Sequence, residues 1–293
     1  MSLAFWRRNT TTSRCCAYLQ PEVLVVANSQ QQIFELALTS AEQWSKAFAS
    51  LSQQAKLGSD QQIVFILGKQ YYQQFQVDKP QVANEELQGA VPWTIKDMVT
   101  EPLSDLAIDY YAAPSNPMAG EKLTVVCVRK NIIQQLVTLA QQHDITIEGI
   151  TIESLAVVNF MEQSERCHML LWQAKGGDLE LIVARQGQVC FSRQLRTFSA
   201  LGKMQEIEFT QNFFDSLSLE LQRSIDYISA TLKLPEVSAI QLAIPSRFCD
   251  TIAQQLQQNL SPKVGLLEVP LLESSEQYYQ LPALAGLQPG VLS

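Results

Sequence analysis

Residues 167–196 read CHMLLWQAKGGDLELIVARQGQVCFSRQLR, and the architecture of the chain can be inferred outward from this segment. It contains three β-rich runs, at 167–173, 179–185 and 188–196, and two turns, Lys175-Gly176-Gly177-Asp178 and Gln186-Gly187. Glycine between apolar runs is typical of hairpin turns, because it adopts backbone angles that other residues avoid. The segment therefore predicts an antiparallel meander of three strands.

The first half of the chain opens with the same pattern, in runs at 14–19, 23–28 and 32–38. Each meander is followed by a predicted helix, at 40–54 in the first half and at about 209–232 in the second. In the second helix, apolar residues recur every three or four positions and form one face. They are Phe213, Leu217, Leu221, Ile225, Ile228 and Leu232.

Each half then ends in a strand–helix–strand pattern. The runs are 123–129, 131–142 and 146–152 in the first half, and 239–244, 246–259 and 263–269 in the second. Such a crossover predicts two parallel strands in one sheet with a helix over its face. A meander, a helix and a βαβ unit, occurring twice, is the topology of actin-like, ribonuclease-H-like ATPases. The expected fold class is α/β, a duplicated actin-like fold of two lobes.

About 50 residues interrupt the first half between the predicted strands at 62–68 and 123–129. They contain strands at 71–77 and 106–111, a helical stretch at 84–98 and a turn-rich tip at 114–120, which is too much for a loop. The predicted organisation is an N-terminal tail at 1–13, a first lobe at 14–68 and 121–158, an inserted subdomain at 69–120 and a second lobe at 159–293.

Composition narrows the function. A length of 293 residues, with 46% hydrophobic and 17% charged, suits two globular domains. The net charge of -8 argues against a nucleic-acid partner, because phosphate binding relies on lysine and arginine. No apolar run is long enough to span a membrane, and no secretory signal opens the chain, so we expect a cytoplasmic protein. Leu3, Phe5 and Trp6 beside Arg7 and Arg8 allow peripheral membrane contact, although packing against the protein itself explains them as well.

The sequence offers few candidates for catalysis or metal binding. Its six cysteines have no CxxC spacing and are expected to be buried, reduced thiols. Cys167-His168 beside Cys190 is the one combination in which a metal site can be imagined, and His143 is interpreted as a helix cap. The carboxylate pairs are expected at exposed positions; they are Glu85-Glu86 and Glu148 with Glu153.

The insertion carries LQGAVPW at 87–93, then Pro102 and Asp109-Tyr110. This segment resembles the PilM-like family of type IV pilus assembly proteins, in which an Ala-Val-Trp helix is followed by a proline and an Asp-Tyr strand. Residues 220–227, ELQRSIDY, and 284–287, LAGL, are similar to the family's long-helix signature and closing turn. Pro92 departs from the pattern, so we expect the insertion helix to be kinked there or to begin at Val91-Pro92.

The resemblance also shows what this chain lacks. Actin-like ATPases use two Gly-x-Asp-x-Gly hairpins and a Gly-Gly turn to approach nucleotide. Here the carboxylate positions hold Ala17 or Tyr18 in the first hairpin and Trp172 or Gln173 in the second, and the adenosine turn at 244–248 has no glycine. We therefore expect no enzyme activity and no ATP or magnesium cofactor. A residual anion site at Lys175, Gly176 and Gly177 is an alternative to an ordinary hairpin turn.

The resemblance implies a scaffold of an MSHA-type pilus machine instead. A cleft between the first lobe and the insertion would capture the N-terminal cytoplasmic peptide of a PilN-like inner-membrane protein, and the assembly motor ATPase is a further possible partner. Candidate groove residues are Trp93, Ile95, Met98, Tyr110 and Tyr111, although the core of the insertion could also use them. The alternatives are an active actin-like ATPase and a detached type II secretion L-type domain.

Overall fold

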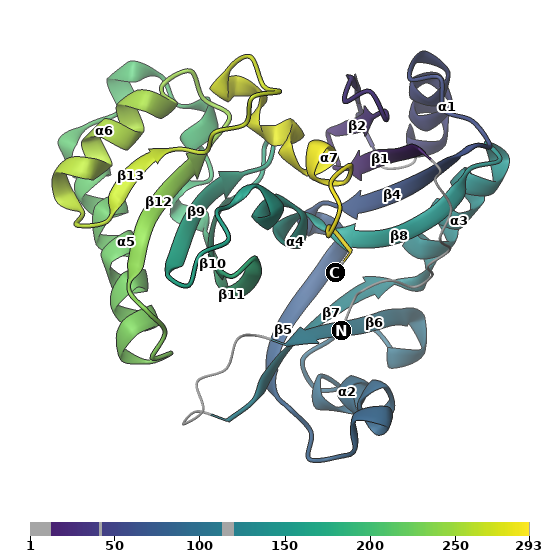
Figure 1. Cartoon of the computed structure of the whole chain (residues 1–293), viewed down its shortest axis with the longest axis horizontal. Helices are drawn as coiled ribbons and strands as arrows, with labels where there is room; N and C mark the ends of the chain where they lie inside the picture. Colours follow the sequence, from purple (N-terminus) through teal and green to yellow (C-terminus); the bar gives the residue numbers. More distant parts are fainter. Residues whose placement is uncertain (1–12, 41–42, 113–119, 293) are drawn as a thin grey trace. The chain divides into compact units, whose positions relative to one another are not determined.

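The computed structural model describes residues 13–40, 43–112 and 120–292 (Figure 1). The chain divides into a first unit, Met1–Ala156 with Pro282–Ser293, and a second unit, Val157–Leu281. The predicted tail, including Leu3 to Arg8, and most of the turn-rich tip at 114–120 lie outside the described residues. Among the helices that the structure describes, none combines the length and apolar composition needed to cross a lipid bilayer.

The first unit is built on a five-stranded sheet of order β3-β2-β1-β4-β8. Its strands are β1 (Ser13–Leu19), β2 (Val23–Ala27), β3 (Ile33–Ala37), β4 (Gln61–Leu67) and β8 (Thr146–Ile152). The first three form the predicted antiparallel meander, and β4 and β8 run parallel to β1. The carboxyl ends of β1, β4 and β8 consequently meet at one edge of the sheet.

Two helices complete the main core of this unit. Helix α1 (Trp44–Gln54) buries Trp44, Phe48 and Leu51, and α3 (Lys130–Gln142) buries Leu136 and Leu139. These residues are spaced three and four apart, so each helix presents one apolar face to the sheet. Burying each large side chain contributes about 1.5–3 kcal/mol.

The insertion forms a separate sheet of order β5-β7-β6, entirely antiparallel. Its elements are β5 (Tyr72–Asp78), α2 (Leu87–Thr94), β6 (Leu106–Ala112) and β7 (Lys122–Arg129). Helix α2 begins at Leu87, so the expectation that it begins at Val91-Pro92 is wrong. Pro92 lies inside the helix, which ends two residues later.

The predicted pairing of β7 with β8 is wrong. We expected residues 123–129 and 146–152 to be parallel neighbours in the first lobe, but β7 is the central strand of the insertion sheet, and β8 pairs with β4. The reason is that β7 is buried on both faces. Val125 and Cys127 pack in the core of the insertion, whereas Val126 and Val128 pack in the main core. A strand covered on both faces reads as a continuous apolar run, like one from a parallel sheet.

The second unit repeats the same sheet order, as β11-β10-β9-β12-β13. Its elements are β9 (Cys167–Gln173), β10 (Leu179–Arg185), β11 (Gln188–Leu195), α5 (Gln211–Ala230), β12 (Val237–Ala243), α6 (Cys249–Asn259) and β13 (Lys263–Leu266). The meander and the parallel β12-α6-β13 crossover predicted for this half are confirmed. Thr210 caps α5 by accepting a hydrogen bond from the Phe213 amide.

The last residues group with the first unit, whereas we expected them in the second lobe. After α7 (Leu281–Ala285), Gly286 lies against β1, and a Cβ atom at Gly286 would be 2.7 Å from the Cβ of Cys16. Arg14 Nη1 donates to the carbonyl of Gln288 at 2.6 Å. A contact between two such distant segments has no signature in local sequence pattern.

Candidate functional site

Tyr18, in the first hairpin, pairs with a buried glutamate that follows β8. Ala17 and Tyr18, at the carboxylate position expected of an ATPase, are both fully buried in β1. The Tyr18 hydroxyl donates to Glu153 Oε2, and the Lys69 amide donates to Glu153 Oε1 at 2.9 Å. Protein groups therefore contact both oxygens of the one carboxylate found at the end of β8.

Glu153 corrects the sequence interpretation. It was expected at an exposed position, but only 1% of it is exposed. Glu148 is also mostly covered, and it accepts hydrogen bonds from the Arg14 guanidinium. The available signal was position: Glu153 directly follows an apolar strand, at the edge of the sheet where α/β folds place functional groups.

The second hairpin is braced by Gln173, which with Trp172 is one of the two residues at its expected carboxylate position. Its Nε2 donates to the carbonyls of Gly177 at 2.9 Å and Ser199 at 2.6 Å. Its Oε1 accepts from the Gly202 amide at 2.8 Å. This buried amide thus uses its hydrogen-bonding groups to hold the hairpin against the 199–202 segment, a role that sequence reasoning missed.

The Lys175-Gly176-Gly177 segment forms the turn between β9 and β10. Gly176 has a φ of 69°, which explains the need for glycine. The Gly177 amide donates to the Ala174 carbonyl at 3.1 Å, and Lys175 Nζ lies 4.7 Å from the centre of the Tyr279 ring. These contacts agree with an ordinary hairpin turn, and a residual anion site stays a prediction.

The predicted adenosine turn, 244–248, packs against an aromatic cluster of the second unit. The Phe209 ring lies 5.5 Å from that of Phe248 and 5.9 Å from that of Phe214. Ser246 accepts from the Phe248 amide through its hydroxyl and from the Ser275 hydroxyl through its carbonyl. This turn is therefore held by aromatic packing and by hydrogen bonds within the second unit.

A small apolar cleft separates the insertion from the main sheet of the first unit. Its volume is about 40 Å³, and it is lined by Leu67, Ala107, Asp109, Val126, Val128, Ile133, Ile150, Thr151 and Ile152. Burial raises the pKa of Asp109, against the opposing effect of its hydrogen bond from the Tyr110 amide. A space of this size accepts one small side chain.

None of the five predicted groove residues lines this cleft. Ile95 and Tyr110 are buried in the core of the insertion, and Tyr111 packs against the main core, with its hydroxyl accepting from Gln74. Trp93 and Met98 are 68% and 51% exposed. The structure therefore does not bring the five together. Of the residues that do line the cleft, sequence reasoning singled out Asp109, and most of the others are ordinary strand residues.

The remaining sequence candidates are the cysteines, and a side-chain hydrogen bond with Cys190 lowers the pKa of the Cys167 thiol. All six cysteines are buried free thiols. Among the described residues, no three side chains of His, Cys, Asp or Glu converge on a possible metal position.

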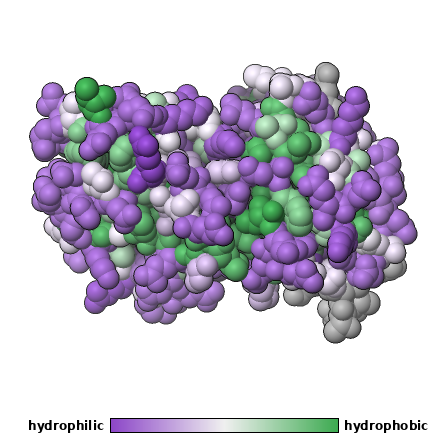
Figure 2. All heavy atoms as spheres, turned by 90° about the horizontal axis from the view of Figure 1, so that it is seen from above, coloured by the Kyte–Doolittle hydropathy of each residue, from purple (hydrophilic) through white to green (hydrophobic). Residues whose placement is uncertain are grey.

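The face drawn in Figure 2 is largely hydrophilic, with smaller hydrophobic areas between the polar ones.

Comparison with known proteins identifies the fold. No protein-family model and no curated protein match the sequence. The chain resembles a solved PilM-PilN type IV pilus biogenesis complex with a TM-score of 0.63 and 13% identity, over 96% of this chain and 100% of that one. It resembles the cytoplasmic domain of EpsL, an inner-membrane component of the type II secretion system of Vibrio cholerae, at 0.51 and 13%, over 96% and 99%.

A third solved structure, from Bacteroides thetaiotaomicron, is described as having an actin-like ATPase fold and unknown function. It matches with a TM-score of 0.50 and 8% identity, over 84% of this chain and 87% of that one. The chain thus has an actin-like ATPase fold of the α/β class, and the predicted fold class is confirmed.

Proposed function

We propose that this protein is a non-catalytic scaffold on the cytoplasmic face of a type IV pilus assembly machine. In this role it docks a short peptide of an inner-membrane partner of the PilN kind. The observation that carries the proposal is the apolar cleft beside the insertion, in a fold similar to that of a PilM-PilN complex. We further propose an MSHA-type pilus, from the resemblance to the biogenesis protein MshI.

The cleft suits an extended peptide. Its walls include β6 and β8, each of which is an edge strand of its sheet within the described part of the chain. An edge strand can pair with an incoming peptide through main-chain hydrogen bonds, while a pocket beside it selects the side chain. The lining is apolar apart from Asp109 and Thr151, so it favours a small aliphatic anchor.

The hairpins support the absence of phosphoryl transfer. Such transfer depends on a placed carboxylate, a magnesium ion and backbone amides that cradle the phosphates. The expected carboxylate positions hold Ala17 or Tyr18 in the first hairpin and Trp172 or Gln173 in the second, and the Tyr18 and Gln173 side chains are engaged by the protein itself. These residues support a protein that acts by binding partners at its surface and not by phosphoryl transfer.

The test is binding of the N-terminal cytoplasmic peptide of the PilN-like partner to the full chain, followed by fluorescence anisotropy. Ala107→Arg places a bulky cation in the cleft and is expected to weaken binding at least about tenfold, equivalent to 1.4 kcal/mol. The matched control is Ala83→Arg, at an exposed position of the insertion. Equal binding by both variants would refute docking in the cleft, and circular dichroism shows whether each variant is folded.

The similarity to EpsL favours a second candidate, an L-type component of a type II secretion system. Affinity purification from solubilised membranes separates the two. Recovery of pilus assembly proteins supports the proposal, whereas recovery of secretion-system proteins supports the second candidate.

A further inference from the structure

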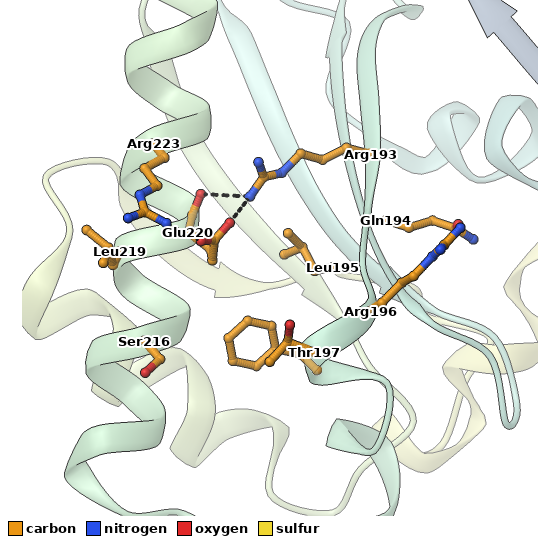
Figure 3. Close-up of a pocket in the computed structure, with 10 residues that line it drawn as sticks. Arg193, Gln194, Leu195, Arg196, Thr197, Ser216, Leu219, Glu220 and Arg223 are labelled. Atoms are coloured by element: carbon orange, nitrogen blue, oxygen red, sulfur yellow. Dashed lines mark hydrogen bonds and ion pairs between the residues drawn. The ribbon is translucent and has the colours of Figure 1, made fainter.

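A groove in the second unit concentrates positive charge on a protein of net charge -8. It has a volume of about 520 Å³ and lies between residues 193–198 and residues 216–223 of α5 (Figure 3). Three of the ten arginines in the sequence line it: Arg193, Arg196 and Arg223. This groove shares no lining residue with the insertion cleft, so a ligand for it can be inferred independently of the proposed function.

One glutamate is shared by two of these arginines. Glu220 accepts from Arg193 Nη2 and from Arg223 Nη1, the latter at 2.6 Å. Arg196 is 80% exposed by side chain, and its nearest described carboxylate, on Asp178, is 4.0 Å away. An exposed pair at that distance is weak. The groove therefore has more positive than negative charge and can take further carboxylates.

The wall of the groove includes a sheet edge. In the described sheet β11 is a terminal strand, and Arg193 to Leu195 lie in it. Such an edge can pair with an extended chain, and β11 contains no proline to prevent this. Leu219, 52% exposed on α5, adds an apolar contact to the groove.

The arginines are spread along the groove. Figure 3 shows Arg193 directed toward Glu220 on α5, whereas Arg196 is directed away from that helix. A compact anion such as phosphate would need the guanidinium groups to converge on one point. Carboxylates spaced along a peptide fit the observed arrangement better, because each can pair with a different guanidinium group.

We propose that this groove binds a short acidic segment of a partner protein, which lies extended along the edge of β11. Its carboxylates pair with Arg196 and Arg223 and compete with Glu220 for Arg193. Charge complementarity selects the partner, and main-chain pairing with β11 sets its direction and register.

The test uses a fluorescein-labelled octapeptide rich in glutamate with two valines, and the same peptide with glutamine in place of glutamate. We expect the full chain to bind the glutamate peptide and not the glutamine peptide. Arg196→Gln with Arg223→Gln removes two guanidinium groups that would pair with the peptide and is expected to weaken binding about tenfold. The matched control is Arg166→Gln, an exposed arginine of the same unit outside the groove.

A second peptide tests whether the bound segment pairs with the edge of β11 through main-chain hydrogen bonds. A glutamate peptide with N-methylated alternate residues keeps its charge but loses main-chain donors, so we expect it to bind more weakly. Each of the following results would overturn the proposal: equal binding of the glutamate and glutamine peptides, an unaffected double variant, full binding of the N-methylated peptide, or equally tight binding of a single-stranded oligonucleotide. Self-association of the double variant without peptide binding would assign the arginines to protecting the edge strand, and would also overturn it.

Discussion

The hydroxyl of Tyr18 donates a hydrogen bond to the carboxylate of Glu153, and both side chains are buried at the carboxyl edge of the first sheet. Ala17 or Tyr18 stands where an actin-like ATPase is expected to carry a carboxylate. The Tyr18 side chain instead makes an internal structural contact with Glu153.

Removing this contact is expected to destabilise the first unit. Tyr18→Phe keeps the ring but removes the hydroxyl that donates to the buried Glu153 carboxylate. A hydrogen bond to a charged group contributes about 1.5–3 kcal/mol, so the free energy of unfolding should fall by that amount. Urea denaturation measures it. Tyr227→Phe, at a 40% exposed position of the second unit, is the control, and an equal loss in both variants would contradict a special role for the Tyr18–Glu153 pair.

Substitution of Gln173 is also expected to lower the free energy of unfolding. Gln173→Leu leaves the Gly202 amide and the Gly177 and Ser199 carbonyls without their partner, and should cost about 1–3 kcal/mol of unfolding free energy. Gln173→Asp loses the two donated hydrogen bonds and is expected to destabilise the hairpin without restoring ATP hydrolysis. Phosphate release by the aspartate variant would show that the site needs only its carboxylate.

The cysteines predict a loss of stability at high pH. Burial raises the pKa of Cys15 and of Cys249 from 9.0 to about 12, and that of Cys127 to about 11. Because the unfolded thiols ionise near pH 9, the stabilisation is complete below that pH and is lost as the pH rises toward 12. We expect the urea midpoint to fall above pH 9, and to fall less in Cys15→Ala.

The same burial predicts slow thiol chemistry. At pH 8, maleimide should label the folded protein slowly at these positions and rapidly in denaturant, because the thiolate is the reactive form. Rapid labelling of Cys15 in the folded protein would contradict its burial.

The buried Asp109 carboxyl is expected to make the free energy of unfolding depend on pH. Its pKa is raised by burial, so folding is favoured when it is protonated and less so as the pH rises through the raised pKa. Asp109→Asn should therefore raise the urea midpoint at pH 7, and the gain should shrink as the pH falls through the raised pKa and vanish below the ordinary carboxyl pKa of 3.8. A gain that is constant with pH would exclude titration of Asp109 as the cause.

Much of the fold was predictable because it depends on local periodicity in the sequence. The Gly176-Gly177 turn, the apolar face of α5 and the β12-α6-β13 crossover follow from patterns within a few tens of residues. Strand β7 was misassigned because residues on both of its faces are buried, and periodicity cannot show which sheet such a strand joins.

The sites were less predictable because they depend on contacts between distant segments. Tyr18 meets Glu153 far along the chain, and Gln173 reaches the Ser199–Gly202 segment. The sequence predicted that the ATPase carboxylates are missing, but it did not predict the contacts that Tyr18 and Gln173 make. The cleft lining was hidden because residues such as Ala107 and Ile150 look like any other strand residue.

The most direct test of the non-catalytic scaffold is isothermal titration calorimetry of the full chain with ATP and magnesium. We expect no saturable heat at millimolar nucleotide, with or without the metal. Magnesium-dependent binding with a micromolar Kd would contradict this, because the buried Tyr18 and Gln173 side chains would then have to yield their positions to a triphosphate.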